Sequence, residues 1–211
     1  MGESTNVKQQ VIIIHGGDTH RTYRGYLAFL KKQPLNYTKL VKGGWKDHLQ
    51  KELGRRFEVV QLKMPNPLNA RYVEWKIMFR KLIPFLKGRP ILVGHSLGSI
   101  FLAKYLSENK FPKKVRATLL VAAPYNNDLR KSSHKQLRAD FALPKSLARF
   151  EKQGGKIFLY QSKDDPVVPF SHFEKYEKAL TRAQGRIFKN RSHFGQEKFP
   201  ELARTIKKLS K

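Results

Sequence analysis

The sequence of 211 residues contains no cysteine, which excludes disulfide bonds and cysteine-liganded metal sites. Its longest apolar run, Ala117 to Pro124, is far shorter than the roughly 20 residues that a membrane-spanning helix requires. The first residues have neither the basic segment nor the apolar core of a secretory signal. We therefore expect a soluble, cytoplasmic protein.

Acidic residues are scarce, since 16 Asp and Glu stand against 43 Lys and Arg and give a formal net charge of +27. A chain with this balance should attract polyanions non-specifically, and salt should weaken that attraction. We find no nucleic-acid recognition motif, and the basic pairs are spread along the chain, at Lys31-Lys32, Arg55-Arg56, Lys113-Lys114, Arg130-Lys131 and Lys207-Lys208. We therefore favour a solvated basic surface over a nucleic-acid-binding or partner-binding protein, which stays the alternative of another class.

The residues Gly94-His95-Ser96-Leu97-Gly98 directly follow an apolar run, Ile91 to Val93, that is typical of a buried strand. A G-x-S-x-G pattern between a strand and a helix is typical of a nucleophile elbow, which presents a serine on a sharp turn. Strand and helix approach each other closely there, so both flanking positions favour glycine. Residues 96–110 carry apolar side chains at the spacing of one helix face and predict a helix there that buries that face. We predict that Ser96 is a catalytic nucleophile and not part of an ordinary loop.

A serine hydroxyl needs a base that takes its proton, and a third group must orient that base. In chains with this elbow, an acid and a histidine follow the serine in that order, each after a later strand. Asp164 and Asp165 follow the predicted strand 156–160, and His193 follows the predicted last strand, 185–188. We favour Asp165 over Asp164, because the turn 165–169 (DPVVP) resembles the Asp-x-x-Val-Pro turn of serine hydrolases. The predicted catalytic residues are Ser96, Asp165 and His193.

The first predicted strand, Val11 to Ile14, ends in His15-Gly16-Gly17, a glycine-rich turn. Such a turn at the carboxyl end of a strand lets backbone N–H groups face a reacting oxygen. Together with the N–H of Leu97, one of them would form an oxyanion hole. We assign this role to Gly17, with Gly16 as the lesser candidate.

Four stretches together resemble the α/β-hydrolase superfamily, and within it the small serine hydrolases related to the retinoblastoma-binding serine hydrolase and its bacterial relatives. They are the opening strand with its glycine turn (11–17), Met64-Pro65-Asn66-Pro67 with the following residues to Trp75, the Gly94–Ser96 elbow, and Asp164–Pro166 with Ser192–Phe194. The Met-Pro-x-Pro stretch is the most family-specific of the four. The resemblance implies the same triad of Ser96, Asp165 and His193. This sequence departs from the family pattern at the first turn, His15-Gly16-Gly17, where the mammalian relative has a longer run of glycines.

Alternating strand and helix patterns predict one α/β-hydrolase domain over residues 1–211, with a mostly parallel sheet and helices on both faces. Six strands are expected, near 11–15, 57–63, 90–95, 116–122, 156–161 and 185–189. Pro84 should end or kink the helix that begins near Asn69. Residues 125–155 are the one long insertion that we identify, and we expect a small flap there. Phe141, Leu143 and Phe150 either wall a pocket or pack the flap onto the core.

The expected activity is that of a carboxylesterase-type serine hydrolase, which cleaves short-chain esters of small molecules through an acyl-enzyme. A small flap favours a shallow pocket, which suits short acyl chains. Thioesters, lactones and amides share the tetrahedral intermediate, so thioesterase, lactonase, amidase and aminopeptidase activities stay open. The sequence has no cluster of metal-binding residues, and the triad chemistry requires no cofactor.

Overall fold

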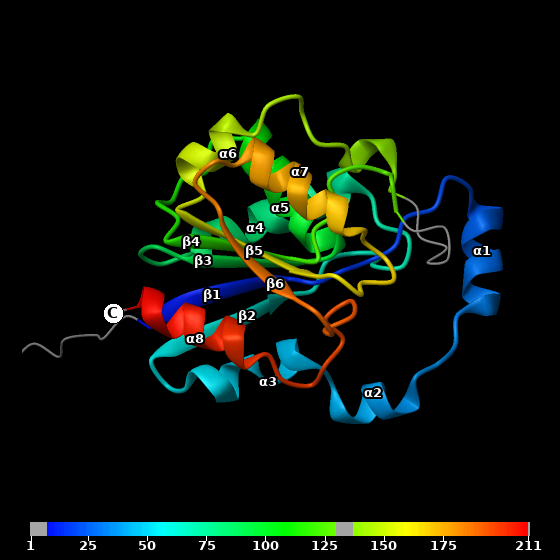
Figure 1. The fold of residues 1–211 in the computed structure, drawn as a ribbon, viewed down its shortest axis with the longest axis horizontal. Helices are drawn as coiled ribbons and strands as arrows, with labels where there is room; N and C mark the ends of the chain where they lie inside the picture. The colour runs from blue at the N-terminus through cyan, green and yellow to red at the C-terminus, as the bar shows by residue number, and fades with distance from the viewer. Residues whose placement is uncertain (1–7, 130–136, 211) are drawn as a thin grey trace, which may run out of the picture.

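A computed structural model describes residues 8–129 and 137–210 of the chain (Figure 1). Six strands form one sheet in the order β2-β1-β3-β4-β5-β6, and every neighbouring pair is parallel. The strands are β1 (Gln9–Ile14), β2 (Phe57–Leu62), β3 (Ile91–His95), β4 (Ala117–Val121), β5 (Lys156–Ser162) and β6 (Gln184–Phe188). The six strands predicted from apolar runs are thus confirmed, with their ends shifted by one or two residues.

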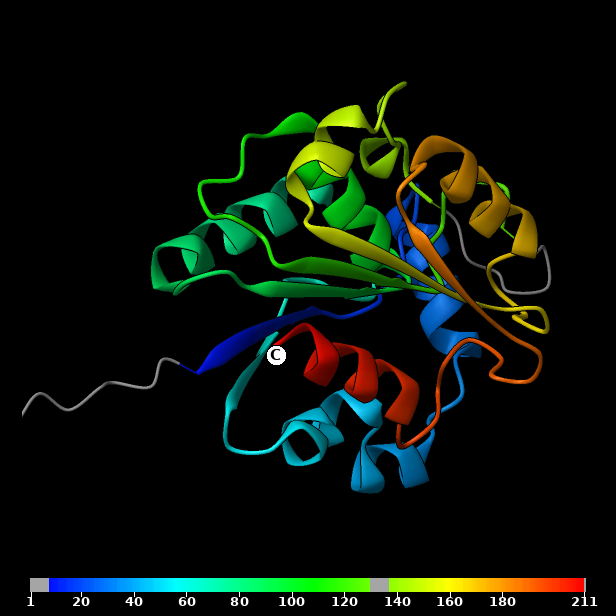
Figure 2. The ribbon, with the colours of Figure 1, turned by 60° about the vertical axis from the view of Figure 1, so that its left-hand side comes forward.

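Helices cover both faces of this sheet, because the apolar strands alternate their side chains between the two sides. Ile12 and Ile14 of β1 belong to one buried cluster, and Val11 and Ile13 belong to the other. Figure 2 shows the two helical layers with the sheet between them. The first layer contains α4 (Tyr72–Leu82), α5 (Leu97–Glu108), α6 (Ala148–Gln153) and α7 (Phe170–Ala179); the second contains α3 (Trp45–Leu53) and α8 (Pro200–Leu209).

The helix after the elbow, α5, is buried on almost every side, whereas its sequence pattern had predicted one buried face. The reason is its central position. The rings of Tyr72, Trp75 and Phe79 on α4 contact the ring of Phe101 on α5. Pro84 acts as predicted: α4 ends at Leu82 and passes into a short 3₁₀ helix, Ile83–Phe85. Among the helices of residues 8–129 and 137–210, none has the length and apolar character to cross a membrane.

The connection between β1 and β2 is a second long insertion, which the sequence analysis did not single out. It carries α1 (Tyr23–Lys32), α2 (Tyr37–Lys42) and then α3. No residue of α1 is buried, and large apolar side chains such as Leu35 (80% exposed) and Tyr37 (74%) face solvent. In Figure 1, α1 and α2 lie on the rim of the molecule away from the C-terminus.

The insertion 125–155 contains the short 3₁₀ helix η3 (Ala139–Phe141) and α6; its residues 130–136 lie outside the described part. Phe141 and Phe150 are fully buried in the main core, and Leu143 packs against the same cluster. The ring of Phe141 makes edge contacts with Tyr72 and Trp75 of α4. Of the two interpretations of these side chains, the structure therefore supports packing onto the core and not the wall of a pocket.

Candidate active site

Ser96 lies on a strained turn between the end of β3 and the first residue of α5. Its φ is +54° and its ψ is −120°, a conformation that L-residues rarely adopt and that is typical of a nucleophile elbow. A Cβ at Gly94 would lie 2.5 Å from the Cα of Ser99, and one at Gly98 would collide with the carbonyl of Ile14. Both glycines of the G-x-S-x-G pattern are therefore required by the close approach of strand and helix.

His193 links Ser96 to Asp165 in one chain of hydrogen bonds. Its Nε2 lies 3.0 Å from the Ser96 Oγ, and its Nδ1 lies 2.9 Å and 3.0 Å from the two carboxylate oxygens of Asp165. Because a carboxylate only accepts hydrogen bonds, the Nδ1 of a neutral imidazole carries the proton. Nε2 is then free to accept the proton of the Ser96 hydroxyl.

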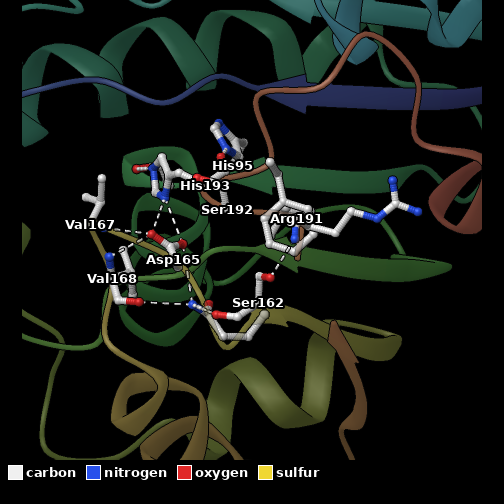
Figure 3. Close-up of polar contacts among 12 residues, drawn as sticks. His95, Ser162, Asp165, Val167, Val168, Arg191, Ser192 and His193 are labelled. Carbon is white, nitrogen blue, oxygen red and sulfur yellow. Dashed lines mark hydrogen bonds and ion pairs between the residues drawn. The ribbon is translucent and has the colours of Figure 1, made fainter. Parts of the chain in front are cut away.

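The turn after β5 holds the carboxylate of Asp165 in place, as Figure 3 shows. The backbone amides of Val167 and Val168 donate to its Oδ1 at 2.8 and 3.0 Å, and the residue is 1% exposed. Pro166 and Pro169 restrict the backbone of the same turn. The structure thus brings Asp165, the favoured candidate of the two adjacent acids, to the imidazole.

Asp164 points to a different partner, the loop that carries His193. Its Oδ1 accepts hydrogen bonds from the Ser162 hydroxyl (2.5 Å) and from the Ser192 amide (2.9 Å). These bonds, with that of Ser162 the largest cause, hold the pKa of Asp164 below its ordinary value. The Ser162 hydroxyl in turn accepts from the Arg191 amide at 2.9 Å (Figure 3). Asp164 therefore fixes the histidine loop to the end of β5.

Two further side chains that the sequence analysis did not assign hold the histidine loop from the other side. His95 Nε2 donates to the carbonyl of His193 at 3.0 Å, and the indole N–H of Trp45 donates to the carbonyl of Phe194 at 3.1 Å. Ser192 and Phe194 both have positive φ, 48° and 52°, so the loop is strained and depends on these bonds. The position of His95 inside the elbow motif was the one sequence signal for its role.

The glycine turn after β1 lies against the elbow. A Cβ at Gly16 would lie 3.1 Å from the Ser96 Cβ, and one at Gly17 would lie 3.2 Å from a methyl carbon of Leu97. In residues 8–129 and 137–210, the amides of Gly17 and Leu97 find no hydrogen-bond partner. The structure therefore places the glycine turn against the elbow, with Gly16 next to Ser96 and Gly17 next to the side chain of Leu97.

His15 fixes the orientation of this turn. Its Nδ1 lies 2.7 Å from the carbonyl of Gly16, and its Nε2 accepts the amide of Met64 at 3.0 Å. Burial lowers the pKa of His15, which keeps the ring neutral and able to make both bonds. Since C=O and N–H point in opposite directions across a trans peptide, a fixed Gly16 carbonyl also fixes the direction of the Gly17 N–H.

The backbone carbonyls of the Met-Pro-x-Pro stretch accept hydrogen bonds from Trp75 and from Asp18, the residue that follows the glycine turn. The carbonyl of Pro65 accepts the indole N–H of Trp75 at 2.8 Å, and the carbonyl of Pro67 accepts the amide of Asp18 at 2.9 Å. Within the described residues, no group of three or more His, Asp or Glu side chains could hold a metal ion.

Comparison with solved structures shows the same fold. The crystal structure of the ydeN gene product from B. subtilis superimposes with a TM-score of 0.69 at 22% identity, covering 97% of this chain and 100% of that one. A ydeN-like hydrolase described as putative, from Pectobacterium atrosepticum, gives a TM-score of 0.64 at 13% identity, covering 96% and 91% of the two chains. The architecture is that of an α/β-hydrolase.

Comparison of sequences shows the family. The chain is 26% identical to the serine hydrolase RBBP9 of Rattus norvegicus over 170 residues, which is 79% of this chain and 86% of the relative. The profile of the serine hydrolase family matches residues 37–203, which include the elbow, both acids and His193. The match spans well over half of the sequence, and the chain belongs to the serine hydrolase family.

Proposed function

We propose that this serine hydrolase cleaves short-chain carboxylic esters of small molecules through the triad Ser96–His193–Asp165. The observation that carries the proposal is the continuous hydrogen-bond chain from the Ser96 Oγ through the imidazole to the Asp165 carboxylate, at 3.0 and 2.9 Å. The carboxylate is buried and held by backbone amides, so its position does not depend on solvent. This is the arrangement that activates a serine hydroxyl.

In the first half of the reaction, the Ser96 Oγ forms a bond to the ester carbonyl carbon while His193 Nε2 takes the hydroxyl proton. The C–O bond to the alcohol then breaks, and His193 returns the proton to the departing alkoxide oxygen. Asp165 stabilises the intervening imidazolium without taking the proton itself. In the second half, a water molecule attacks the acyl-enzyme by the same steps and releases the carboxylic acid.

The amides of Gly17 and Leu97 stabilise the negative charge on the carbonyl oxygen of the tetrahedral intermediate. Loss of one such donor in other enzymes lowers kcat by about 10²–10³-fold. Here His15 holds the Gly16–Gly17 peptide in place before substrate binds. The donors are therefore oriented in advance, which is the condition under which they contribute most.

A fluorophosphonate probe tests the nucleophile directly, because it reacts covalently with activated serines. The wild-type protein should be labelled, and Ser96→Ala should abolish labelling while circular dichroism shows an unchanged fold. Ser210→Ala, at the exposed end of α8, is the matched control and should keep full labelling. Labelling that survives in Ser96→Ala would place the nucleophile at another residue.

The preference for short acyl chains rests on the insertion 125–155. Phe141 and Phe150 are fully buried in the core, so neither side chain is available to cover a long acyl tail. Each methylene left unburied forfeits about 0.8 kcal/mol. On p-nitrophenyl esters of rising length, kcat/KM should be highest between acetyl and hexanoyl. A higher value for dodecanoyl than for butyryl esters would refute this preference.

The same series separates the ester from its chemical alternatives. Thioesters, lactones and aminoacyl amides pass through the same tetrahedral intermediate and would use the same residues. A thioester, a lactone and an aminoacyl amide of matched acyl group should all be turned over more slowly than the oxygen ester. A faster rate on one of them would reassign the bond that the enzyme cleaves and leave the triad proposal intact.

A further inference from the structure

Cationic residues stand before neighbouring strands at the amino edge of the sheet, the edge opposite to Ser96. Arg56 precedes β2, Lys8 precedes β1, Arg116 precedes β4, and Arg89 lies just before β3. Backbone contacts hold these positions side by side: the Gln9 amide donates to the Arg56 carbonyl at 3.0 Å, and its side chain donates to the Arg89 carbonyl at 2.8 Å. Because adjacent strands lie about 4.8 Å apart, the cations form a row across the edge.

Two adjoining hollows lie along this row. The first has a volume of about 710 Å³, and seven of the eleven residues that line it are Lys or Arg. The second has a volume of about 590 Å³ with six such residues among nine, and Arg89 lines both. Among the residues that the structure describes, no Asp or Glu lines either hollow. We call their Lys and Arg residues the amino-edge cations.

None of the amino-edge cations forms an ion pair with a carboxylate in residues 8–129 and 137–210. Five other Lys and Arg residues in the described part of the chain do pair with carboxylates, among them Arg191 with Glu201 at 2.6 Å. Arg116 donates through Nη1 to the carbonyl of Leu209 at 2.8 Å, but its buried Nε finds no partner among the described residues. Unpaired like charges repel one another, and a bound anion would relieve that repulsion.

We propose that the amino edge binds a linear phosphate polyanion along the row of cations. A row spaced at the width of a strand matches a ligand with successive negative charges better than it matches a single ion. Phe57, the aromatic residue lining the first hollow, is 3% exposed and unavailable for base stacking. Recognition would therefore depend on the phosphate chain, which both inorganic polyphosphate and single-stranded nucleic acid supply.

The experiment measures the affinity of the full-length protein for a fluorescent single-stranded DNA of about 16 nucleotides at two salt concentrations. Arg56→Glu with Arg89→Glu reverses two exposed cations of the row. Arg24→Glu with Lys31→Glu on α1 is the matched control, because it changes the net charge equally at a distant, exposed helix. Turnover of a butyrate ester should stay unchanged in both variants. The ester assay thus tests the esterase proposal, and the DNA affinity tests the amino-edge proposal independently of it.

At about 0.15 M salt, the amino-edge variant should bind at least about tenfold more weakly than the wild type, and its salt slope should fall by about 1–2. The α1 variant should lose less than about threefold. An equal loss in both variants would show that net charge alone attracts the polyanion and would overturn the proposal. Absence of wild-type binding to DNA and to polyphosphate at this salt would overturn it as well.

Competition by inorganic polyphosphate identifies the source of the phosphate chain. Displacement of the DNA at equal phosphate concentration, with no effect of Phe85→Ala, supports a site for the bare phosphate chain. Phe85 is 71% exposed and lies two residues from Lys87, a residue of the first hollow. A loss of DNA affinity in Phe85→Ala, with polyphosphate affinity unchanged, supports the same row with single-stranded nucleic acid as its ligand.

Discussion

In the part of the chain that the structure describes, charged side chains are paired at one edge of the sheet and unpaired at the other. At the carboxyl edge, the Asp165 carboxylate meets the imidazole of His193 and two backbone amides, and Asp164 meets Ser162 and Ser192. At the amino edge, the cations line open hollows and meet no carboxylate among the described residues. The first arrangement fixes a few groups in one geometry, whereas the second leaves many groups free to meet an outside charge.

The two arrangements suit two different kinds of function. Bond cleavage requires groups held within a few tenths of an ångström, which the hydrogen bonds of the carboxyl edge supply. Electrostatic attraction requires charge density and tolerates mobile side chains. Changes at one edge should therefore leave the function of the other unchanged.

The largest effect is expected at Asp165. Asp165→Asn keeps the shape of the side chain but removes the charge that stabilises the imidazolium and sets its tautomer, so kcat should fall by about 10⁴-fold. Asp164→Asn is the matched change on the neighbouring residue. It keeps one acceptor oxygen for Ser192 and should cost about tenfold at most. Steady-state kinetics on a butyrate ester gives both numbers.

The reverse ranking of the two substitutions would show that Asp164 is the acid that serves His193. Affinity for the labelled DNA provides the second measurement. Both substitutions should leave it unchanged within about twofold, because the row of cations lies at the other edge. A parallel loss of turnover and of DNA affinity would mean that the two edges are not independent.

The sequence predicted what depends on short stretches of chain. Apolar runs located all six strands, and the glycines of the elbow follow from a close approach between consecutive elements. The preference for Asp165 over Asp164 also came from a short stretch, the turn 165–169, which resembles the Asp-x-x-Val-Pro turn of serine hydrolases.

What could not be predicted depends on which distant segments meet. Trp45 contacts the carbonyl of Phe194 across 149 positions of sequence, and no local pattern indicates such a contact. Phe141 and Phe150 were equally compatible with a pocket and with a core, because apolar side chains fit either. Arg55-Arg56 lies far from Arg89 and Arg116 in the sequence. The order of the strands in the sheet brings them together, and no local pattern indicates that order.

A smaller effect is expected at His15, the positioning residue of the glycine turn. His15→Ala frees the Gly16 carbonyl and leaves the Met64 amide without its acceptor, so the Gly17 N–H loses its fixed direction. We expect kcat to fall by about 10–10²-fold with KM nearly unchanged, because the interaction forms in the transition state. His20→Ala, a buried histidine of the same connection, is the control and should change kcat by less than about threefold. Equal rises of KM in both variants would indicate general damage to the turn.

The smallest effect concerns stability at low pH. Burial is the main cause that lowers the pKa of His172 below its ordinary value of 6.5, with a smaller contribution in the same direction from Lys175. The hydrogen bond to the Asp128 carbonyl and the negative charges of Asp128 and Asp165 oppose this shift without reversing it. The neutral ring accepts the Tyr125 amide at 2.8 Å and donates to the Asp128 carbonyl at 2.7 Å.

Because the folded protein holds this histidine neutral, the unfolded chain binds more protons as the pH falls through 6.5. The contribution of His172 to the free energy of unfolding is therefore complete above that pH and is lost progressively below it. Burial also lowers the pKa of His15, so His15 contributes to the same loss of stability at low pH.

Urea denaturation at about pH 7.5 and about pH 5.5 should show this loss of stability. His172→Asn, which retains an acceptor for Tyr125, should make the loss smaller. Lysine and arginine keep their charge between about pH 5.5 and 7.5, so the affinity of the amino edge for polyphosphate should not change with pH over this range. A pH dependence of stability that is unchanged in His172→Asn would assign the protonation to another group, and a matching change in polyphosphate affinity would contradict the independence of the two edges.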